Sequence, residues 1–233
     1  MDDALPAATA RPRLRDTVLR LGREVCPPIV WRGLRRVAGR RPASDLYDYL
    51  RPEHFLDAWR EIERALDEHR RRLPARPRPR FLDIGGRTGS RRGYAQGFEY
   101  HLLDLAPRGE ADRVFAADIC ACPDVPDASY DVCFSVAVFE HVRRPWDAAR
   151  EIGRILRPGG LAVTHTVFAW EYHDKPVDFW RYTHLSLPFL FQAYGGLETV
   201  RCGYDITGRW RNRGTDYFQE HWWVIHVARK PLA

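Results

Sequence analysis

Lysine is nearly absent from this chain: of its 37 basic residues only Lys175 and Lys230 are lysines. Long apolar runs are absent as well, since none approaches the roughly 18 residues that a bilayer-spanning helix needs. The first 13 residues lack the basic-then-apolar order of a secretion signal. An integral membrane protein and a secreted protein are therefore not expected, and the sequence predicts a cytoplasmic location.

Cysteine is scarce and odd in number, with five residues in 233. An odd count without a secretion signal fits a reducing compartment. Cys120 and Cys122 stand one residue apart, but no second pair of ligands follows at zinc spacing. We therefore expect free thiols and no bound metal.

The chain is long enough, and at 45% hydrophobic apolar enough, to bury one large domain or a domain with an appendage. Its net charge of +6 is uneven, because residues 1–80 hold 19 arginines against 12 acidic residues, while residues 81–233 are slightly acidic. Such asymmetry can mark a surface for nucleic acid or anionic membrane. An arginine bias also follows from a GC-rich coding sequence, which is the explanation we favour.

The N-terminal third has the spacing of amphipathic helices, over residues 14–25, 29–37 and 52–72. A proline-rich stretch at 74–79 then predicts an extended break. We place a domain boundary there, with a helical appendage at 1–79 and a second domain at 80–233. The appendage is expected to cap the ligand pocket. Its arginine-rich part, residues 11–41, could alternatively lie weakly on an anionic membrane.

The rest of the chain alternates strand and helix. Strands are predicted at 80–84, 99–104, 113–117, 130–136, 161–167, 198–204 and 221–228, with a helix at 146–156 that a turn at 157–160 ends. This alternation favours a parallel sheet covered on both faces. A polar loop, 205–220, joins the last two strands, which should pair antiparallel. The predicted fold class is α/β: a Rossmann-like, doubly wound sheet of seven strands with an antiparallel last strand, plus the N-terminal helical appendage.

A glycine-rich turn follows the first of these strands. Gly85, Gly86 and Gly89 let the backbone approach a ligand closely, because they carry no side chain. Ligands of open parallel sheets bind at the carboxyl ends of the strands, where this turn is expected. The spacing differs from the G-x-G-x-x-G of dinucleotide-binding proteins.

Three acidic residues follow three successive strands. Asp83 precedes the turn, where a carboxylate suits a cationic group and makes a poor cradle for pyrophosphate. Asp104 ends the second strand, where an acid can accept both hydroxyls of a ribose, and Asp118 follows the third, placed for an adenine amino group. These acids fit a positively charged nucleoside better than a phosphorylated one.

Five segments, in this order, resemble the class I S-adenosylmethionine-dependent methyltransferases. They are residues 83–89, 103–104, 117–119, 130–135 with 139–142, and 154–160. The resemblance covers residues 80–230 and implies S-adenosyl-L-methionine as the cofactor. The cofactor-binding residues that it implies are Asp83, Gly85, Gly86, Gly89, Asp104, Leu105, Asp118, Ile119 and Ser135.

This chain has Arg87 where the family usually has a second glycine. A bulky side chain there crowds the methionine part of the cofactor unless it points outward or contacts the substrate. The Gly-Gly-Arg form also resembles some methyltransferases of natural-product and cell-surface saccharide pathways.

The segment after the fifth strand is the candidate substrate side. Residues 173–183 resemble an H-x-x-P-x-D-[FY]-W-R-[FY]-T signature that we associate with small-molecule and sugar methyltransferases. The substrate-binding candidates are Asp178, Trp180, Arg181 and Tyr182. In the alternative reading, Asp178 pairs with Arg181 while the two aromatic residues pack beneath the sheet.

Methyl transfer needs little from a protein beyond positioning and desolvation, because the sulfonium donor is already activated. A hydroxyl or amine acceptor still benefits from a nearby base. The candidates are His141 and His173, with His165 third, although a lone histidine is more often structural.

The predicted function is methyl transfer to a small-molecule or saccharide acceptor, by resemblance an O-methylation in a natural-product or cell-surface glycan pathway. One alternative is a non-catalytic binding module that keeps the methyltransferase fold. Another is a nucleic-acid methyltransferase, which the basic N-terminal third suggests. Against it, residues 135–138 lack the Asn-Pro-Pro-Tyr type of motif, so no nucleic-acid partner is expected. The oligomeric state stays open.

Overall fold

The computed structural model describes residues 54–73, 78–173, 177–211 and 218–232. The chain divides into two compact units, Met1–Arg51 and Pro52–Ala233. The first unit lies outside the described residues. The predicted helices at 14–25 and 29–37, and the membrane-binding segment 11–41, therefore stay predictions.

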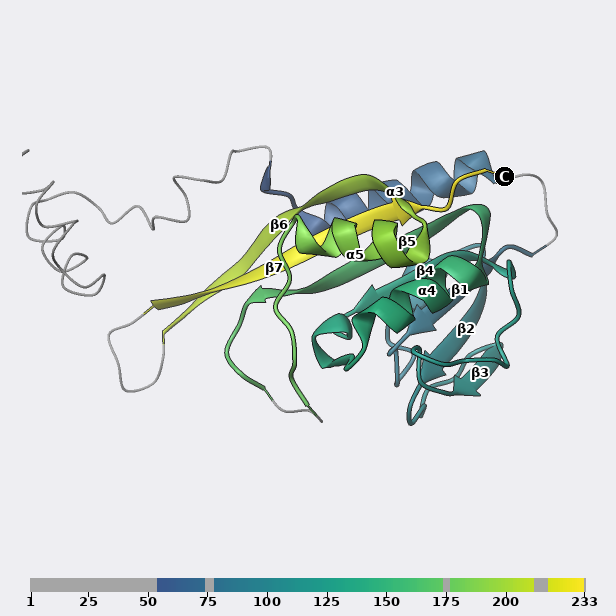
Figure 1. Ribbon diagram of the computed structural model, residues 1–233, viewed down its shortest axis with the longest axis horizontal. Coiled ribbons are helices and arrows are strands. Elements are labelled where there is room, and N and C mark those ends of the chain that lie inside the picture. Colours follow the sequence, from purple (N-terminus) through teal and green to yellow (C-terminus); the bar gives the residue numbers. More distant parts are fainter. Residues whose placement is uncertain (1–53, 74–77, 174–176, 212–217, 233) are drawn as a thin grey trace, which may run out of the picture. The chain divides into compact units, whose positions relative to one another are not determined.

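A sheet of seven strands forms the centre of the second unit (Figure 1). The strands run in the order β3-β2-β1-β4-β5-β7-β6. Strands β1 to β5 are parallel, and β7 is antiparallel to both of its neighbours, β5 and β6. Their bounds are β1 Arg80–Ile84, β2 Glu99–Asp104, β3 Arg113–Ala116, β4 Tyr130–Val136, β5 Leu156–Ala169, β6 Glu198–Arg211 and β7 Phe218–Arg229. The predicted Rossmann-like fold is confirmed, including its antiparallel final strand.

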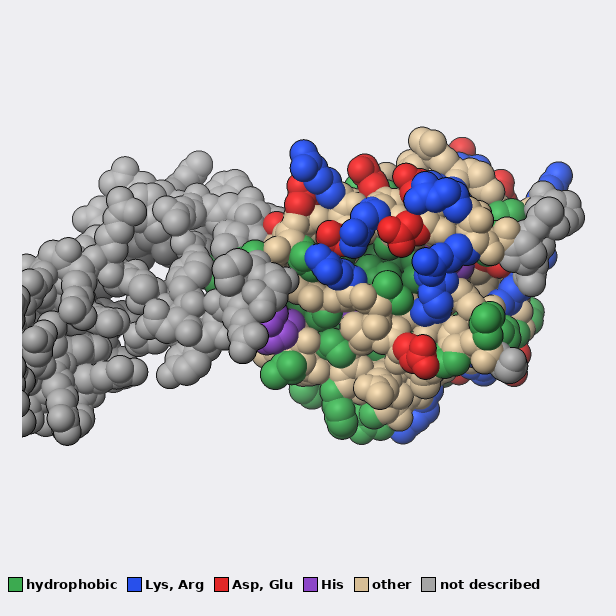
Figure 2. Space-filling view, turned by 90° about the horizontal axis from the view of Figure 1, so that it is seen from above, with side chains coloured by type: hydrophobic (Ala, Val, Ile, Leu, Met, Phe, Trp, Pro, Cys, Tyr) green, Lys and Arg blue, Asp and Glu red, His purple; other side chains and the backbone are tan. Residues whose placement is uncertain are grey.

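One face of the sheet is covered by α3, Ala58–Arg72. The helix begins after Asp57, whose carboxylate accepts a hydrogen bond from the Arg60 N–H. Its apolar stripe, Ala58, Ile62 and Leu66, is fully buried in one core with the side chains of the central strands. Its outer face is charged with both signs, as Figure 2 shows, and carries ion pairs such as Arg64–Glu61.

Because α3 completes the core of the sheet, it belongs to the same compact unit as the strands. The boundary between the two units lies between Arg51 and Pro52, and so differs from the predicted boundary at residue 79. The proline-rich stretch joins two elements of one domain instead of separating two domains.

The opposite face is covered by α4, Pro145–Ile155, and α5, Ser186–Gly195. These helices approach each other closely, since a Cβ on Gly153 would lie 2.1 Å from the Gly195 carbonyl oxygen. From α5, Phe191 reaches the sheet beside His226, with ring centroids 5.2 Å apart. Among the described residues, no helix is long and apolar enough to cross a bilayer.

Three differences from the predicted elements have physical reasons. Strand β5 starts at Leu156 and absorbs the predicted turn at 157–160, because Gly159 supplies the positive φ there. Strands β6 and β7 pair as far as Arg211 and Phe218, so most of the predicted polar loop is a two-stranded ribbon. Helix α5 was not predicted. Apolar residues lie on both its buried and its exposed sides, as Leu187 and Phe189 do, so the sequence lacks the apolar–polar alternation typical of an amphipathic helix.

Candidate functional site

A cavity of about 820 Å³ opens at the carboxyl ends of β1, β2 and β3, beside the segment after β4. This is where the strand order reverses, between β1 and β4, and where open α/β sheets bind ligands. The volume lies within the range of small-ligand sites. The lining residues are Ile84, Gly85, Arg87, Leu103, Asp104, Leu105, Ala106, Ala117, Asp118, Ile119, Ala137, Val138, His141, Val142, Arg143, Val177 and Phe179.

The glycine turn after β1 forms one wall of the cavity. Gly85 has φ +70° and donates its N–H to the Leu103 carbonyl at 2.7 Å, which ties the turn to the end of β2. A Cβ on Gly85 would lie 2.3 Å from Cγ2 of Val138, and one on Gly86 would lie 2.1 Å from Oδ2 of Asp83. Both positions therefore require glycine. Of the three predicted glycines, Gly85 lines the cavity, while Gly86 and Gly89 lie outside the lining.

Arg87 also lines the cavity, and its side chain is exposed. Its φ of 20° is positive, and its carbonyl oxygen accepts hydrogen bonds from the N–H groups of Arg108 and Gly109, at 2.7 and 2.8 Å. These bonds hold the turn against the loop after β2. The cavity remains open beside Arg87, which is one of its lining residues.

Asp83 lies behind the turn and does not line the cavity. Its side chain is fully buried, and its Oδ2 accepts a hydrogen bond of 2.6 Å from the Tyr100 hydroxyl. Burial raises the pKa of Asp83 to about 6, although the Tyr100 bond and Arg91 act in the opposite direction. Asp83 supports the turn from beneath, and its direct contact with a cofactor stays a prediction.

The other two acids reach the cavity from the ends of β2 and β3. Oδ1 of Asp104 accepts the Ala106 N–H at 2.8 Å, and Oδ1 of Asp118 accepts the Cys120 N–H at 2.9 Å. Each local bond orients a carboxylate and occupies one of its oxygens. Two apolar side chains, Leu105 and Ile119, line the cavity next to these acids.

Ser135, the remaining cofactor candidate, is buried within β4 opposite Ile84 and lies outside the lining. The structure thus gathers Gly85, Asp104, Leu105, Asp118 and Ile119 at one cavity. It leaves Asp83, Gly86, Gly89 and Ser135 in the layer around it.

The segment between β5 and α5 holds the four predicted substrate residues. The Asp178 side chain is fully buried and pairs with Arg181 through bonds of 2.5 and 2.8 Å. These bonds from the guanidinium hold the pKa of Asp178 down at about 2. Arg181 also donates to the carbonyls of Trp170 and Glu171. This ion pair between Asp178 and Arg181 is the one that the alternative interpretation of the sequence predicted, and it holds this part of the chain together.

Trp180 and Tyr182 attach the same segment to η3, Phe139–His141. The Trp180 indole donates to the Val142 carbonyl at 2.9 Å, and the buried Tyr182 hydroxyl donates to the Phe139 carbonyl at 3.1 Å. None of the four predicted substrate residues lines the cavity, so their direct substrate contact stays a prediction.

Sequence reasoning missed Val177 and Phe179, which do line the cavity. They alternate in the sequence with Asp178 and Trp180, whose side chains bond to Arg181 and to the Val142 carbonyl. The signature residues therefore hold the segment in place, and their apolar neighbours face the ligand space.

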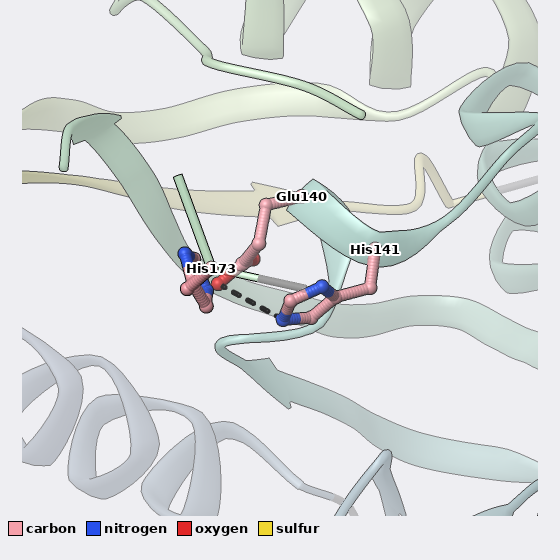
Figure 3. Close-up of side chains that lie close together, drawn as sticks. All are labelled: Glu140, His141 and His173. Carbon is pink, nitrogen blue, oxygen red and sulfur yellow. Dashed lines mark ion pairs between the residues drawn. The ribbon is translucent and has the colours of Figure 1, made fainter. Parts of the chain in front are cut away.

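The two predicted catalytic histidines lie together, with ring centroids 4.9 Å apart (Figure 3). His141 lines the cavity, its Nδ1 contacts the Val177 carbonyl oxygen, and its Nε2 lies 3.9 Å from Oε1 of Glu140. Nδ1 of His173 lies 3.2 Å from Oδ2 of Asp178. Glu140 was missed as a candidate because its full burial depends on residues far away in the sequence.

His165, the third histidine candidate, is buried in β5 and lies outside the cavity lining. Burial lowers its pKa to about 4, with a further contribution from Arg91. Of the three histidines only His141 lines the cavity, and His173 lies beside it outside the lining, so the catalytic role of both stays a prediction.

Comparison with known proteins agrees with this architecture. A family model described as a methyltransferase domain matches residues 57–194, more than half of the chain. The chain therefore belongs to this family of methyltransferase domains. The resemblance to class I S-adenosylmethionine-dependent methyltransferases is confirmed, and S-adenosylmethionine is the cofactor of that class.

Two sequence relatives give the extent of the similarity. An uncharacterized methyltransferase of Mycobacterium ulcerans (strain Agy99) is 42% identical over 104 residues, which are 38% of this chain and 39% of the relative. The malonyl-(acyl-carrier protein) O-methyltransferase of Erwinia pyrifoliae is 31% identical over 170 residues, 63% of each protein. The chain thus spans well under half the length of the mycobacterial relative.

One solved structure shows the shared fold. It is the 1,6-didemethyltoxoflavin-N1-methyltransferase of Burkholderia thailandensis, with bound 1,6-didemethyltoxoflavin and S-adenosylhomocysteine. It superposes with a TM-score of 0.52 at 18% identity, over 97% of this chain and 93% of the other. At this identity the likeness supports the fold alone.

Proposed function

We propose that the cavity binds S-adenosylmethionine and that the protein transfers its methyl group to a small polar acceptor. The observation that carries this proposal is the pair of oriented carboxylates, Asp104 and Asp118, at the ends of adjacent strands. Asp104 is placed for the ribose hydroxyls and Asp118 for the adenine amino group. Leu105 and Ile119 offer apolar walls to the adenine ring.

These two carboxylates fit the cofactor and argue against a phosphorylated nucleotide. Both are carboxylates, which accept hydrogen bonds from ribose hydroxyls and an adenine amino group and offer no donor to a phosphate. When bound, S-adenosylmethionine supplies an activated methyl group, so the chain's residues have mainly to position the acceptor and exclude water. Arg87 is the one cation of the glycine turn that lines the cavity, and its exposed side chain leaves the apolar walls accessible.

The acceptor side is the part of the cavity lined by His141, Val177 and Phe179. Apolar walls with a few polar groups suit a small molecule or a saccharide. The contact of His141 Nδ1 with a carbonyl oxygen places the proton on Nδ1, so Nε2 keeps a lone pair for an acceptor proton. His173, held by Asp178, is the second candidate base.

An oxygen acceptor in a natural-product or cell-surface glycan pathway is the finer form of this proposal. It rests on the family resemblance of the segment at 173–183 and on no single contact. The Erwinia relative is named as an O-methyltransferase and the Burkholderia structure as an N-methyltransferase, so members of this fold methylate different atoms.

We also propose a cytoplasmic location, which the four described cysteines support because all of them are free thiols. Nucleic acid is not favoured as the acceptor. On the face drawn in Figure 2, acidic and basic side chains are intermixed, whereas nucleic-acid surfaces concentrate positive charge. Weak membrane association through residues 11–41 stays a separate proposal.

Titration calorimetry with S-adenosylmethionine and S-adenosylhomocysteine tests the cofactor site. The wild type should bind one molecule, and Asp104→Ala should weaken binding by at least about tenfold, since hydrogen bonds to a charged group are lost. Asp124→Ala, an exposed acid outside the lining, is the matched control. No binding at millimolar cofactor would overturn the proposal. Binding without methyl transfer to any offered acceptor would favour the non-catalytic module.

A further inference from the structure

Glu140, His141 and His173 form a compact cluster (Figure 3), and His141 of this cluster lines the cavity. Each offers one ligand atom, and these atoms lie within 4.8 Å of one another. We propose that this cluster binds a divalent transition-metal ion, with Zn²⁺ as the best match. The proposal departs from the expectation that the protein uses no metal.

The first argument is the carboxylate of Glu140. Its side chain is fully buried, and Oε2 accepts a hydrogen bond of 2.6 Å from the Thr166 hydroxyl. Oε1 is also buried but has no hydrogen-bond partner among the described residues. A buried carboxylate oxygen without a partner is costly, and a bound cation would remove that cost. The nearest ring nitrogen to Oε1 is Nε2 of His141, at 3.9 Å.

The second argument is the orientation of the two imidazoles. Nδ1 of His141 contacts the Val177 carbonyl, and Nδ1 of His173 faces Oδ2 of Asp178 and the Glu171 carbonyl, each at 3.2 Å. Both acceptors require a proton on Nδ1, so Nε2 carries the lone pair in each ring. Metal-binding histidines have this arrangement, with the second ring nitrogen donating to a carbonyl or a carboxylate.

The carboxylate that faces His173 is itself held in place. Asp178 is fixed by the two bonds from Arg181, and its Oδ2 lies 3.2 Å from Nδ1 of His173, so the ion pair orients the carboxylate that accepts from the imidazole N–H. We therefore assign the Asp178–Arg181 pair a role that neither sequence interpretation, substrate binding or simple mutual pairing, included: it positions His173.

The donor set indicates which ion is bound. Two imidazoles and one carboxylate are the protein ligands of catalytic zinc sites that keep an open position. Zn–ligand bonds of 2.0–2.2 Å place tetrahedral ligand atoms about 3.4 Å apart. The observed separations are 3.9 Å for Glu140–His141 and at most 4.8 Å overall, so the ligand atoms have to close in by up to about 1.4 Å.

A metal ion there would lie where His141 lines the cavity, next to the acceptor space. There it could orient an acceptor hydroxyl and favour loss of its proton. This consequence rests on the proposed function, whereas metal binding itself does not. His141 cannot serve as base and ligand at once, because both roles use the lone pair on Nε2.

The test uses the full chain, treated with a chelator and dialysed, then titrated with Co²⁺ by visible absorption and with Zn²⁺ by calorimetry. The wild type should bind one ion at this site. Glu140→Gln and His173→Gln should weaken binding by at least about 100-fold, and Asp178→Asn by about tenfold, as for residues that orient a metal ligand. His184→Gln, a half-buried histidine outside the cluster, should bind as the wild type does.

Circular dichroism establishes that each variant is folded. Glu140→Gln keeps an acceptor for Thr166, and His173→Gln changes a partly exposed residue, so the two variants test the site independently. A wild type that binds neither ion, or binding by both variants as tight as that of the wild type, overturns the inference. Cofactor binding is measured on the same samples. Cofactor binding without metal binding refutes the metal site alone, and metal binding without cofactor binding refutes the proposed function alone.

Discussion

The Tyr100 hydroxyl donates a hydrogen bond of 2.6 Å to Oδ2 of Asp83, and both side chains are buried beneath the glycine turn. The other carboxylate oxygen, Oδ1, has no hydrogen-bond partner among the described residues, and the Arg91 guanidinium lies 4.0 Å from it. A carboxyl group with a pKa of about 6 therefore lies directly behind the wall of the cofactor cavity. Its charge state couples the stability of this turn to pH.

Asp83→Asn should remove one pH-dependent contribution to stability. The pKa of Asp83 is about 6 in the folded chain, against 3.8 ordinarily, so the folded state holds the proton more tightly. The contribution of Asp83 to the free energy of unfolding is therefore fully present below about pH 4. It falls by up to about 3 kcal/mol as the pH rises to about 6.

Urea unfolding at about pH 4.5 and about pH 7.5 measures this effect. The stability of Asp83→Asn relative to wild type should be greater at the higher pH, since Asn keeps an acceptor for Tyr100 and carries no buried charge. Asp124→Asn, at an exposed acid, is the control. The same difference between Asp83→Asn and wild type at both pH values would contradict the prediction.

The stability contribution of His165 should depend on pH in the opposite direction to that of Asp83, and His165→Phe should remove this dependence. Both ring nitrogens of His165 are buried without partners among the described residues, and the ring packs against Trp59 and Trp223. Its pKa is lowered from 6.5 to about 4, so the unfolded state binds the proton more readily between these values. The contribution of His165 is present above about pH 6.5 and is lost as the pH falls toward 4.

The Phe variant should match or exceed the wild type at about pH 7.5, by up to about 2 kcal/mol, because no polar atom is left unpaired. It should also lose less stability than the wild type on acidification to about pH 5. Burial lowers the pKa of His69 and His226 as well, so part of the acid sensitivity will remain. If thermal melts show that variant and wild type lose the same stability on acidification, His165 is not the source of this pH dependence.

The sequence predicted the centre of the sheet well. Strands β1, β2 and β4 have the predicted bounds: β1 ends before Gly85, β2 ends at Asp104, and β4 ends before Ala137, whose φ of 56° turns the chain. The placement of Asp104 and Asp118 at one cavity follows from the same pattern, since parallel strands bring their carboxyl ends to one edge.

What the sequence could not show depends on contacts between distant segments. The burial of Glu140 depends in part on Thr166 in β5 and on residues 179 and 180, whose N–H groups bind the Glu140 carbonyl at 2.8 and 3.2 Å. The local pattern around Phe139 and His141 contains no sign of these partners. Likewise, nothing in the local pattern shows that Val177 and Phe179, rather than Asp178 and Trp180, line the cavity.

Gly85→Ala should abolish cofactor binding and lower the free energy of unfolding by more than about 2 kcal/mol, because the added Cβ meets Val138 at 2.3 Å and φ is +70°. Gly97→Ala is the matched control: it has φ +82° with no atom within 4 Å of the added Cβ, so it should cost only about 1 kcal/mol. Adding Val138→Ala to Gly85→Ala removes the clash but not the backbone strain. Calorimetry should then show partial recovery of binding, and no recovery would mean that the clash is not the cause.

Arg87→Gly should favour S-adenosylmethionine over S-adenosylhomocysteine. Arg87 lines the cavity and has a φ of 20°, which glycine adopts without strain, and its backbone bonds to Arg108 and Gly109 do not depend on the side chain. The first ligand carries a positive sulfonium and the second a neutral sulfur, so only the first is repelled by the guanidinium. Removing that charge should raise the affinity ratio by about threefold to tenfold at cavity distances. Arg87→Met removes the charge but keeps much of the bulk of the side chain. A charge effect should shift the affinity ratio in both Arg87→Gly and Arg87→Met. A steric effect should instead strengthen the binding of both ligands equally, and only in Arg87→Gly. An unchanged ratio in both variants would place the sulfonium away from Arg87.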